Sequence, residues 1–503
     1  MTLTAETKKR IFSDTTASEL YNNYLSYHSR LATQYAHPIA ERNSTLVADL
    51  EEKANTLEKE LVRTVAGYGE ARKQISWQEI QAGLKPNEAA IEFIHFGYCT
   101  PNFRDSIFYS ALVLRPGWES PRMVYLCEQR QLDSLLQEAD VDITVEQLYT
   151  SRGITPGSKA SSSQLYRLLW QPINSLLNGV NTVYFSPSGQ LHRIAFSAIP
   201  IPDTNEVLAD QYKLIQLFST RSIVPPAQAN HLALVPASVA LFGGIRYELS
   251  NENTFTPLDS NELASVQLST PLLPDTRINR GEGWQYLPGT AQEVTRLQEV
   301  FRQQGISSAI WTDSLATEEE FKALDDTASS PAILHLATHG FFFPDPKLDK
   351  NRLHGLDGNS IPLSENPLMR SGLLLAGANQ AWKEGKPLPG KEDGILTAYE
   401  IAQVNLSGTQ LAVLSACETG LGDIQASEGV MGLQRAFKMA GVEKLIVSLW
   451  QVPDKQTAVF MESFYTNWLT KGSNIRDAFY DTQSQMRKRY KDPFVWAGFV
   501  LVE

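Results

Sequence analysis

A histidine and a cysteine each follow a short apolar run that ends at a glycine-containing turn. The first run begins at Ala332 and leads to His339, and the second begins at Leu411 and leads to Cys417. Such runs are typical of buried parallel strands. Sites in parallel sheets form where the carboxyl ends of neighbouring strands meet. If these two strands pair, an imidazole and a thiol meet there, which is the minimum apparatus of a cysteine hydrolase.

The chemistry assigns a role to each group. The Cys417 thiol must lose its proton to become a nucleophile, and His339 is placed to accept that proton and return it to a leaving amine. The backbone amides of Gly340 and Cys417 are candidates for binding the oxyanion of a tetrahedral intermediate, a contact that contributes about 2.7–4 kcal/mol where it has been measured. Glycine at position 340 would also let a substrate backbone approach closely.

Other histidines and cysteines have simpler interpretations. His335 precedes His339 by four residues and both could point to one face of the strand, but its mid-strand position favours a hydrogen-bonded core residue. No metal site is expected, because a His-x-x-x-His spacing on a strand lacks a third ligand. We expect His95 and His192 to be structural, and Cys99 and Cys127 to be buried thiols.

Composition limits the class of protein. The chain has 503 residues and a net charge of -12, and its longest basic cluster, residues 487–491, is too short to predict nucleic-acid binding. Three cysteines do not make a disulfide framework. Neither a signal peptide nor a membrane span is evident, so we expect a cytoplasmic protein with no membrane contact. No cofactor is expected.

Residues 14–66 predict two amphipathic helices separated by a break at Pro38. This hairpin either packs on the neighbouring domain or serves as a docking or oligomerisation element. The two apolar stripes are Leu20, Tyr24, Leu31 and Tyr35, and then Leu46, Leu50, Ala54, Leu57, Leu61 and Val65.

From residue 75 onward, strands and helices alternate, which predicts an α/β fold with a mostly parallel sheet flanked by helices. Before residue 232 we expect strands at 89–96, 108–114, 123–127 and 182–186 and a helix at 165–173. After it, strands are expected near 239–243, 307–311, 332–339, 411–417 and 444–450, with helices near 397–404, 428–440, 454–470 and 474–489. Two further helices are predicted: one opens with a capping box at Thr290–Glu293, and the other is capped by the segment Thr317–Glu320.

Three motifs resemble the CHAT family of caspase-like proteases, which is related to separase, caspases and gingipains. They are the His-Leu-Ala-Thr-His-Gly segment ending at Gly340, Leu-Ser-Ala-Cys-Glu-Thr-Gly ending at Gly420, and Ser-Leu-Trp-Gln-Val-Pro-Asp ending at Asp454. Weaker similarity begins near Trp77, so the resemblance covers roughly residues 75–503. The tetratricopeptide repeats common in this family are missing or reduced to the N-terminal helices.

The resemblance implies a cysteine endopeptidase with a caspase-like sheet. His339 matches the general base of the family, Cys417 its nucleophile and Gly340 the glycine of the oxyanion hole. It also implies three regions: N-terminal helices (1–70), a catalytically silent caspase-like domain (75–232) and an active domain (235–503). The cysteine follows the histidine by more than the roughly 50 residues of caspases. One excursion from Phe341 to about Gly394 accounts for the difference, and we expect one of its loops, at 344–366 or 383–393, to gate the cleft.

Substrate recognition is predicted for Trp450, Asp454 and Glu418. By resemblance to separase, Trp450 and Asp454 line the pocket for the residue before the scissile bond, where an aspartate would pair with arginine or lysine. Two alternatives remain open: Asp454 caps the following helix, and Trp450 belongs to the core. An apolar pocket that selects leucine or methionine is also compatible with the sequence.

The expected function is therefore cleavage of a specific protein partner in a bacterial defence or programmed-death pathway, for example activation of a gasdermin-like pore-forming effector. This context comes from the family resemblance. An activating partner could bind through the N-terminal helices. The alternatives are a catalytically inactive scaffold with the same fold and a cysteine-dependent acyl hydrolase that acts on small molecules.

Overall fold

The fold is described from a computed structural model. It describes residues 16–17, 19–21, 23–24, 26–27, 44–64, 75–98, 106–137, 163–224, 236, 238–249, 283–324, 330–342, 367–369, 371–384, 391–415, 422–425, 429–450 and 452–503. Cys417, Glu418, Cys99 and the loop at 344–366 lie outside these residues, as does most of the loop at 383–393.

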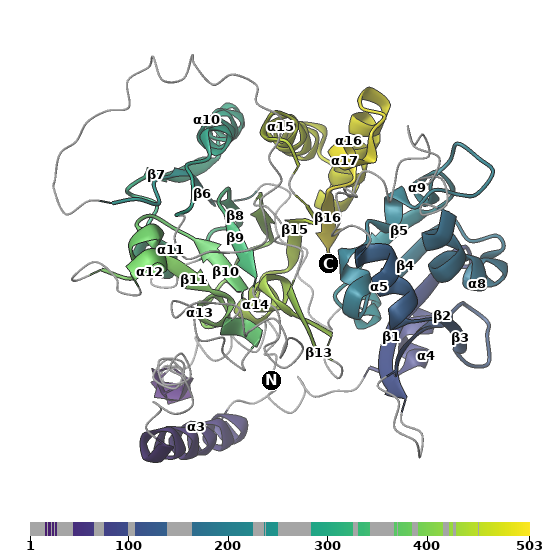
Figure 1. Cartoon of the computed structure of the whole chain (residues 1–503), viewed down its shortest axis with the longest axis horizontal. Coiled ribbons are helices and arrows are strands. Elements are labelled where there is room, and N and C mark those ends of the chain that lie inside the picture. The colour runs from purple at the N-terminus through teal and green to yellow at the C-terminus, as the bar shows by residue number, and fades with distance from the viewer. Residues whose placement is uncertain are drawn as a thin grey trace.

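An eleven-stranded sheet forms the centre of the molecule, in the order β3-β2-β1-β4-β5-β16-β15-β12-β8-β6-β7 (Figure 1). Its strands are β1 (Glu88–Tyr98), β2 (Ser106–Leu114), β3 (Arg122–Glu128), β4 (Thr182–Ser186), β5 (Lys213–Gln216), β6 (Ser238–Ile245), β7 (Ser307–Asp313), β8 (Ile333–Leu336), β12 (Leu411–Leu414), β15 (Lys444–Ser448) and β16 (Phe499–Val502). Two smaller sheets contain β9 (Gly340–Phe342), β10 (Ser371–Leu374) and β11 (Ile395–Thr397), and β13 (Gly422–Gln425) with β14 (Gly429–Gly432).

The two strands that lead to His339 and Cys417 are neighbours. β8 and β12 pair in parallel with Ile333 opposite Leu411 and Leu336 opposite Leu414. The amide of Ser415 extends this pairing by donating to the carbonyl of Leu336 at 2.9 Å. The pairing predicted from the two apolar runs is therefore confirmed.

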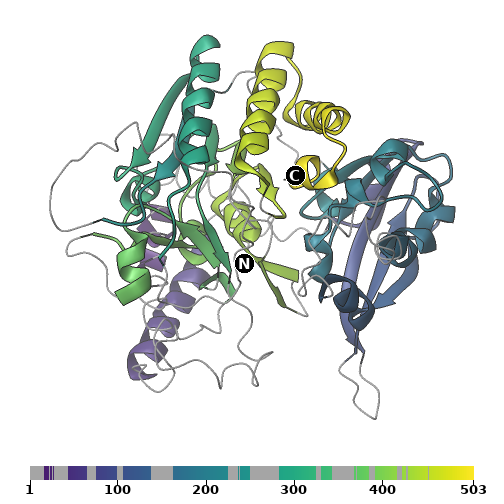
Figure 2. The ribbon, with the colours of Figure 1, turned by 45° about the horizontal axis from the view of Figure 1, so that its top comes forward.

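Helices cover both faces of this part of the sheet, as expected for strands that are buried on both sides. Every residue of β8 and β12 is buried. Figures 1 and 2 show α10 (Pro288–Gln303), α15 (Asp454–Lys471) and α16 (Ile475–Arg489) together on one side, and Figure 1 shows α13 (Ala398–Ile401) and α14 (Leu433–Ala440) on the other. The predicted α/β fold class is confirmed.

The predicted helices 454–470 and 474–489 correspond closely to α15 and α16. Thr317 caps α11 (Glu318–Lys322) as predicted, with its hydroxyl accepting from the Glu320 amide. The predicted helix 428–440 is shorter than expected, because residues 429–432 form β14 and α14 begins at Leu433. The remaining short helices are α4 (Trp77–Ala82), α5 (Gln129–Gln137), α8 (Gln171–Asn174), α9 (Leu208–Gln211), α12 (Ala378–Glu384) and α17 (Pro493–Trp496).

The capping box predicted at Thr290–Glu293 is wrong. Helix α10 begins earlier, at Pro288, and no side chain caps it. The Thr290 hydroxyl donates to the carbonyl of Leu287 at 2.7 Å and accepts from the amide of Gly244 at 2.9 Å. Glu293 instead binds a histidine in the core, as described below. Both side chains therefore have tertiary partners in place of the local backbone amides that the sequence pattern predicted.

The strands before residue 232 join the same sheet. The predicted strands correspond to β1–β4, whereas β5 was not predicted because Lys213–Gln216 is short and begins and ends with polar residues. β5 pairs in parallel with β16 at a single position, Gln216 opposite Val502. The main hydrophobic core also runs through both parts of the sheet. The three-region domain organisation remains a prediction.

The second N-terminal helix is α3 (Ser44–Thr64), which lies below α13 in Figure 1. From its predicted stripe, Leu50, Ala54 and Leu61 are buried. In the preceding segment Ala17 and Tyr21 are buried, whereas Leu20 and Tyr24 are only half-buried. The stripe therefore lies in the predicted place on α3 and is shifted on the segment before it.

Arg476 stabilises the junction between the two parts of the sheet. Its guanidinium donates to both carboxylate oxygens of Glu503, at 2.8 and 2.6 Å, and lies over the ring of Tyr184. The Arg476→Ala variant should lose about 3 kcal/mol of unfolding free energy, because the Glu503 side chain, only 7% exposed, keeps a buried charge. Denaturant titration measures this loss.

The matched control is Lys213→Ala, which removes the neighbouring but half-exposed ion pair with Asp477. Its effect should stay within about 1 kcal/mol. Equal losses for the two variants would contradict the role assigned to Arg476.

Candidate active site

His339 lies just past the end of β8, between two aromatic rings. Its ring centroid is 5.1 Å from that of Tyr247 and 5.0 Å from that of Trp284. The Tyr247 hydroxyl accepts from the His339 amide at 3.3 Å and contacts the Thr338 hydroxyl at 2.9 Å. Trp284 is held in turn by its amide, which donates to the Asn379 side chain at 2.6 Å. Side chains from three other segments therefore fix the imidazole.

A backbone carbonyl sets the tautomer of His339. Nε2 lies 2.9 Å from the carbonyl oxygen of Gln285, which can only accept, so Nε2 carries the proton. Nδ1 is then the basic nitrogen of the neutral ring. Burial lowers the pKa of His339, and the hydrogen bond to Gln285 opposes this shift. The imidazole is accordingly neutral near pH 7 and available as a base.

Gly340 begins β9, a strand of the three-stranded sheet, where it is paired with Leu373 of β10. The sequence had suggested a turn at this position. Cys417 and Glu418 lie outside the described residues, so the predicted nucleophile and oxyanion hole stay predictions. The described strands lead up to them. Leu336 and Leu414 are paired, and His339 follows the first by three residues as Cys417 follows the second.

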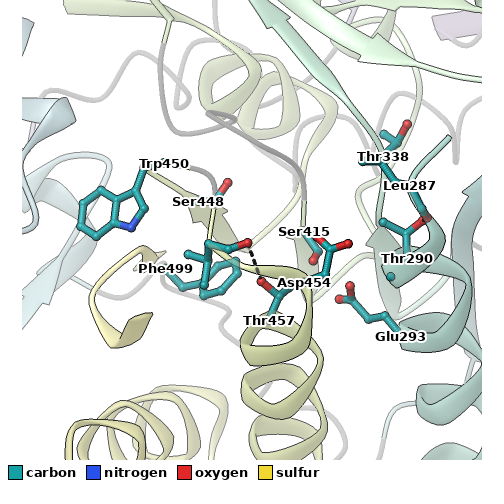
Figure 3. Close-up of a pocket in the computed structure, with 12 residues that line it drawn as sticks. Leu287, Thr290, Glu293, Thr338, Ser415, Ser448, Trp450, Asp454, Thr457 and Phe499 are labelled. Atoms are coloured by element: carbon teal, nitrogen blue, oxygen red, sulfur yellow. Dashed lines mark hydrogen bonds between the residues drawn. The ribbon is translucent and has the colours of Figure 1, made fainter. Parts of the chain in front are cut away.

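A pocket opens beside this edge of the sheet (Figure 3). Its volume accessible to a water-sized molecule is about 30 Å³, and residues from the ends of β8, β12 and β15 line it. Thr338 and Ser415 lie next to the catalytic candidates in sequence, and Trp450 and Asp454 come from the segment after β15. The structure thus brings the predicted Trp450 and Asp454 to one pocket, which Thr338, the residue before His339, also lines.

Trp450 belongs to both of its predicted environments. It is 4% exposed, stacks on Phe494 and donates from Nε1 to the Phe494 carbonyl at 2.8 Å. In Figure 3 its ring lies at the end of the pocket away from Asp454. It is a core residue that also forms part of the pocket wall.

Asp454 is the first residue of α15, whose N-cap is Pro453. Its carboxyl group accepts from the backbone amides of Gly289 and of Asp454 itself. A Cβ atom at position 289 would lie 2.4 Å from the Asp454 carboxylate, so this close approach requires glycine. Burial, and then the neighbouring charge of Glu293, raises the pKa of Asp454. The carboxyl group faces the pocket rather than serving as the N-cap of α15 (Figure 3).

His335 is a buried core residue, as expected. It is fully buried, with Nε2 at 2.9 Å from Glu293 Oε1 and Nδ1 at 3.2 Å from the Tyr465 hydroxyl. A carboxylate accepts only, so Nε2–H donates to Glu293 and Nδ1 accepts from Tyr465. Both ring nitrogens therefore have hydrogen-bond partners in the core.

The other candidates are structural. His95 Nδ1 lies 2.6 Å from the Ser188 hydroxyl, and its ring stacks on Tyr109. Burial lowers the pKa of His192 to about 4 and raises that of the Cys127 thiol to about 12. A thiol with so high a pKa is not a nucleophile at neutral pH, and an imidazole with so low a pKa is a poor base there. No cluster of potential metal ligands occurs among the residues that the structure describes.

Within the same residues, no helix is both long and apolar enough to span a lipid bilayer.

Sequence reasoning missed Tyr247, Trp284, Gln285, Glu293 and Ser415. Gln285 acts through its main-chain carbonyl, a group that every residue has, so the residue type gives no indication of this role. Trp284 and Tyr247 belong to no motif and reach His339 only through tertiary packing. Ser415 alone carried a usable signal, because it lies two residues before Cys417 and alternation along a strand places such residues on the same side.

Comparisons with known proteins point to one family. The model of the CHAT domain matches residues 159–503. Among curated proteins, "Tetratricopeptide repeat protein 28" is 24% identical over 318 residues in Mus musculus and 25% identical over 324 residues in Homo sapiens. Each alignment covers 62% of this chain and only 12% of the relative.

Two solved structures with similar chains can be described. The Arg-specific cysteine proteinase gingipain R is 10% identical, with a TM-score of 0.36 and coverage of 73% of this chain and 74% of that one. The Saccharomyces cerevisiae separase–securin complex contains a chain that is 9% identical, with a TM-score of 0.42 and coverage of 97% and 34%.

The packing around His339 predicts its titration. Replacing Trp284 with alanine should expose the imidazole and raise its pKa toward the ordinary value of about 6.5, since burial is the main cause of the lowered pKa. NMR titration of 13C-labelled histidine can follow the change, with His339→Gln identifying the signal. His192, whose low pKa arises from burial elsewhere, is the internal control and should not move. A wild-type His339 pKa at or above 6.5 would refute this account.

Proposed function

Because the chain belongs to the CHAT domain family, we propose that it is a caspase-like cysteine endopeptidase with Cys417 as nucleophile and His339 as general base. The observation that carries the proposal is the parallel pairing of β8 and β12. It supports the expectation that the imidazole and the thiol meet at one edge of the sheet. The neutral, oriented imidazole of His339 is the second support.

The proposed mechanism uses the free nitrogen of His339. Nδ1 accepts the proton of the Cys417 thiol, and the thiolate attacks the carbonyl carbon of the scissile peptide bond. The amides of Gly340 and Cys417 stabilise the resulting oxyanion. The imidazolium then donates its proton to the leaving amine, and a water molecule, deprotonated by the same nitrogen, hydrolyses the thioester. The Gln285 carbonyl keeps Nε2 protonated throughout, so that Nδ1 performs every proton transfer.

Substrate contacts are proposed for Trp450, Asp454 and Glu418. Asp454 and Trp450 line one pocket together with Thr338 and Ser415, which lie close in sequence to His339 and Cys417, and this fits a role in binding the residue before the scissile bond. Glu418 follows the nucleophile directly and would lie close to any bound substrate.

The biological proposal is cleavage of one specific protein partner in the cytoplasm, in a bacterial defence or programmed-death pathway. A gasdermin-like effector is the example that the family suggests. An activating protein is proposed to act through the N-terminal helices, of which α3 is one. No direct contact with nucleic acid or membrane is proposed. The competing function is a non-catalytic scaffold.

A library of proteome-derived peptides separates these functions. Incubation with the wild-type protein should create new N-termini that mass spectrometry can map. Cys417→Ala should abolish cleavage, and His339→Ala should lower its rate by about 10²–10⁴-fold, the usual contribution of a general base.

Cleavage that survives Cys417→Ala would refute the proposed nucleophile. Equal binding of a captured partner by the wild type and both variants, with no new N-terminus in any sample, would favour the scaffold. Cys127→Ala is the control for thiol loss, since that thiol is buried in the first part of the sheet and its variant should cleave normally.

A further inference from the structure

A second pocket lies at the junction between the two parts of the sheet, and the proposed peptidase mechanism uses none of its residues. Its volume accessible to a water-sized molecule is about 360 Å³, a size typical of small-molecule sites. One wall is the edge where the parallel strands β1, β4 and β5 begin, with Glu88 opposite Thr182 and Thr182 opposite Lys213. The start of α16 forms the other wall. The lining is almost entirely polar, so the pocket suits a polar ligand.

Three cations line this pocket, although the chain has a net charge of -12. Lys85 precedes β1, Lys213 begins β5 and Arg476 lies in the first turn of α16. They outnumber the two carboxylates of the wall, Glu88 and Asp477. A positive cleft in an acidic protein favours an anionic ligand, because its field attracts negative charge.

Both lysines have N–H groups that the protein does not use. Lys85 Nζ lies 4.0 Å from the Glu88 carboxylate, beyond hydrogen-bond distance, and its side chain is 78% exposed. Lys213 Nζ donates to Asp477 at 2.7 Å, and an ammonium group has two further donors. Neither Nζ makes another hydrogen bond within the described part of the chain. The two ammonium groups are therefore available to an anion.

The carboxylates of the wall are occupied by protein donors. Glu88 accepts from the Lys85 amide at 2.9 Å and from the Tyr184 hydroxyl at 3.5 Å. Asp477 accepts from the Asn474 side chain at 2.9 Å as well as from the lysine described above. These contacts fix the carboxylates beside the cations, so that they position positive charge at the edge of the sheet.

Arg476 brings a third cation from the opposite wall. It gives Nε and Nη2 to Glu503, so this ion pair does not use Nη1. Lys444 Nζ lies 3.9 Å from the same carboxylate, which therefore has two cations near it and does not cancel the positive charge of the pocket. A ligand that reached Arg476 and Lys85 together would connect α16 with the first part of the sheet.

Two asparagines in the pocket can bind hydroxyl groups. Nδ2 of Asn87 donates to Oδ1 of Asn181 at 2.7 Å, and the Thr182 hydroxyl donates to the same oxygen at 3.1 Å. The side-chain oxygen of Asn87 and Nδ2 of Asn181 make no hydrogen bond among the described residues. One is an acceptor and the other a donor, which is the combination that a hydroxyl group satisfies.

We propose that this pocket binds a small sugar phosphate, with Lys85, Lys213 and Arg476 around the phosphate and with Asn87 and Asn181 on the sugar hydroxyls. Phosphate oxygens accept from lysine and arginine, and these charge-assisted hydrogen bonds are strong. The volume corresponds to about a dozen water molecules at about 30 Å³ each, which is more than a phosphate ion fills.

A nucleotide fits the pocket less well than a sugar phosphate. Base binding relies on stacking against an aromatic face. Tyr184 is the aromatic residue of the lining, and the guanidinium of Arg476 already lies over its ring, 5.8 Å from the centroid. Ile215 is the one aliphatic residue of the lining. The wall therefore offers hydrogen bonds and charge, which match hydroxyl and phosphate groups, and little apolar surface for a base.

Calorimetry of the full chain tests the proposal with ribose 5-phosphate as the probe, and with ribose and inorganic phosphate in parallel titrations. We expect ribose 5-phosphate to bind at least tenfold more tightly than inorganic phosphate, because its hydroxyls add contacts. Ribose alone should show no measurable binding. Added NaCl should weaken binding, since salt screens exposed charges. Peptide cleavage plays no part in these titrations, so their result does not depend on the proposed peptidase function.

Two kinds of variant separate the phosphate contacts from the sugar contacts. Lys85→Met and Lys213→Met should each weaken the binding of ribose 5-phosphate and of inorganic phosphate at least fivefold. Asn87→Ala should weaken only the binding of ribose 5-phosphate. The matched control is Lys53→Met on α3, where Lys53 pairs with Asp49 at 2.8 Å and both side chains are 49% exposed, much like the Lys213 pair at 44% and 47%. It should leave all affinities unchanged.

The results that would overturn the proposal are specific. Absence of binding of both phosphate compounds to the wild type would remove the site. So would equal affinities of Lys213→Met and Lys53→Met for ribose 5-phosphate. Inorganic phosphate that binds as tightly as ribose 5-phosphate would overturn the sugar contacts. The lysine side chains are exposed, so these variants should unfold at the wild-type temperature without ligand, and a lost affinity then reports on the site.

Discussion

The parallel pairing of β8 with β12 is the constraint on which the candidate site depends. Register in a sheet is all or nothing, because a slip of one residue sends every side chain to the opposite face. Four consecutive pairs fix the register here, in two strands that are buried along their whole length. The apolar residues that cannot tolerate exposure therefore also determine where the chain segments carrying His339 and Cys417 leave the sheet.

His335 in β8 and His339 just past its end have different chemistry, and the difference comes from their partners. Both imidazoles have a protonated Nε2, bound by Glu293 in one case and by the Gln285 carbonyl in the other. The distinction lies at Nδ1. In His335 the Tyr465 hydroxyl occupies it, whereas in His339 it makes no hydrogen bond within the described residues. A neutral imidazole with an unoccupied nitrogen can act as a base, and one with two occupied nitrogens acts as a structural link.

Much of the fold could be predicted from the sequence because apolar periodicity is local. The strands from β1 to β4, the β8–β12 pair, α15 and α16 all followed from it. The failures have a physical pattern. The Thr290–Glu293 pair looks like a helix cap, but Gly244 and His335, distant in sequence, compete for its side chains and prevail. β5 is too short and polar to be recognised alone, and becomes a strand by pairing with β4 and β16. The environment of His339 depends on the main-chain carbonyl of Gln285 and on Tyr247 and Trp284, which belong to no sequence motif.

The carboxylates of Glu293 and Asp454 show why the pocket is more than a packing defect. Like charges repel more strongly in a buried site than in water, and burial adds a desolvation penalty to each charge. The raised pKa of Asp454 reflects both effects. Apolar residues of similar volume would relieve this strain and often stabilise a core. Instead, Gly289 leaves room for Asp454, and His335 with Tyr465 hold Glu293 against it. The fold thus keeps two acidic side chains in one largely buried pocket at a cost in stability.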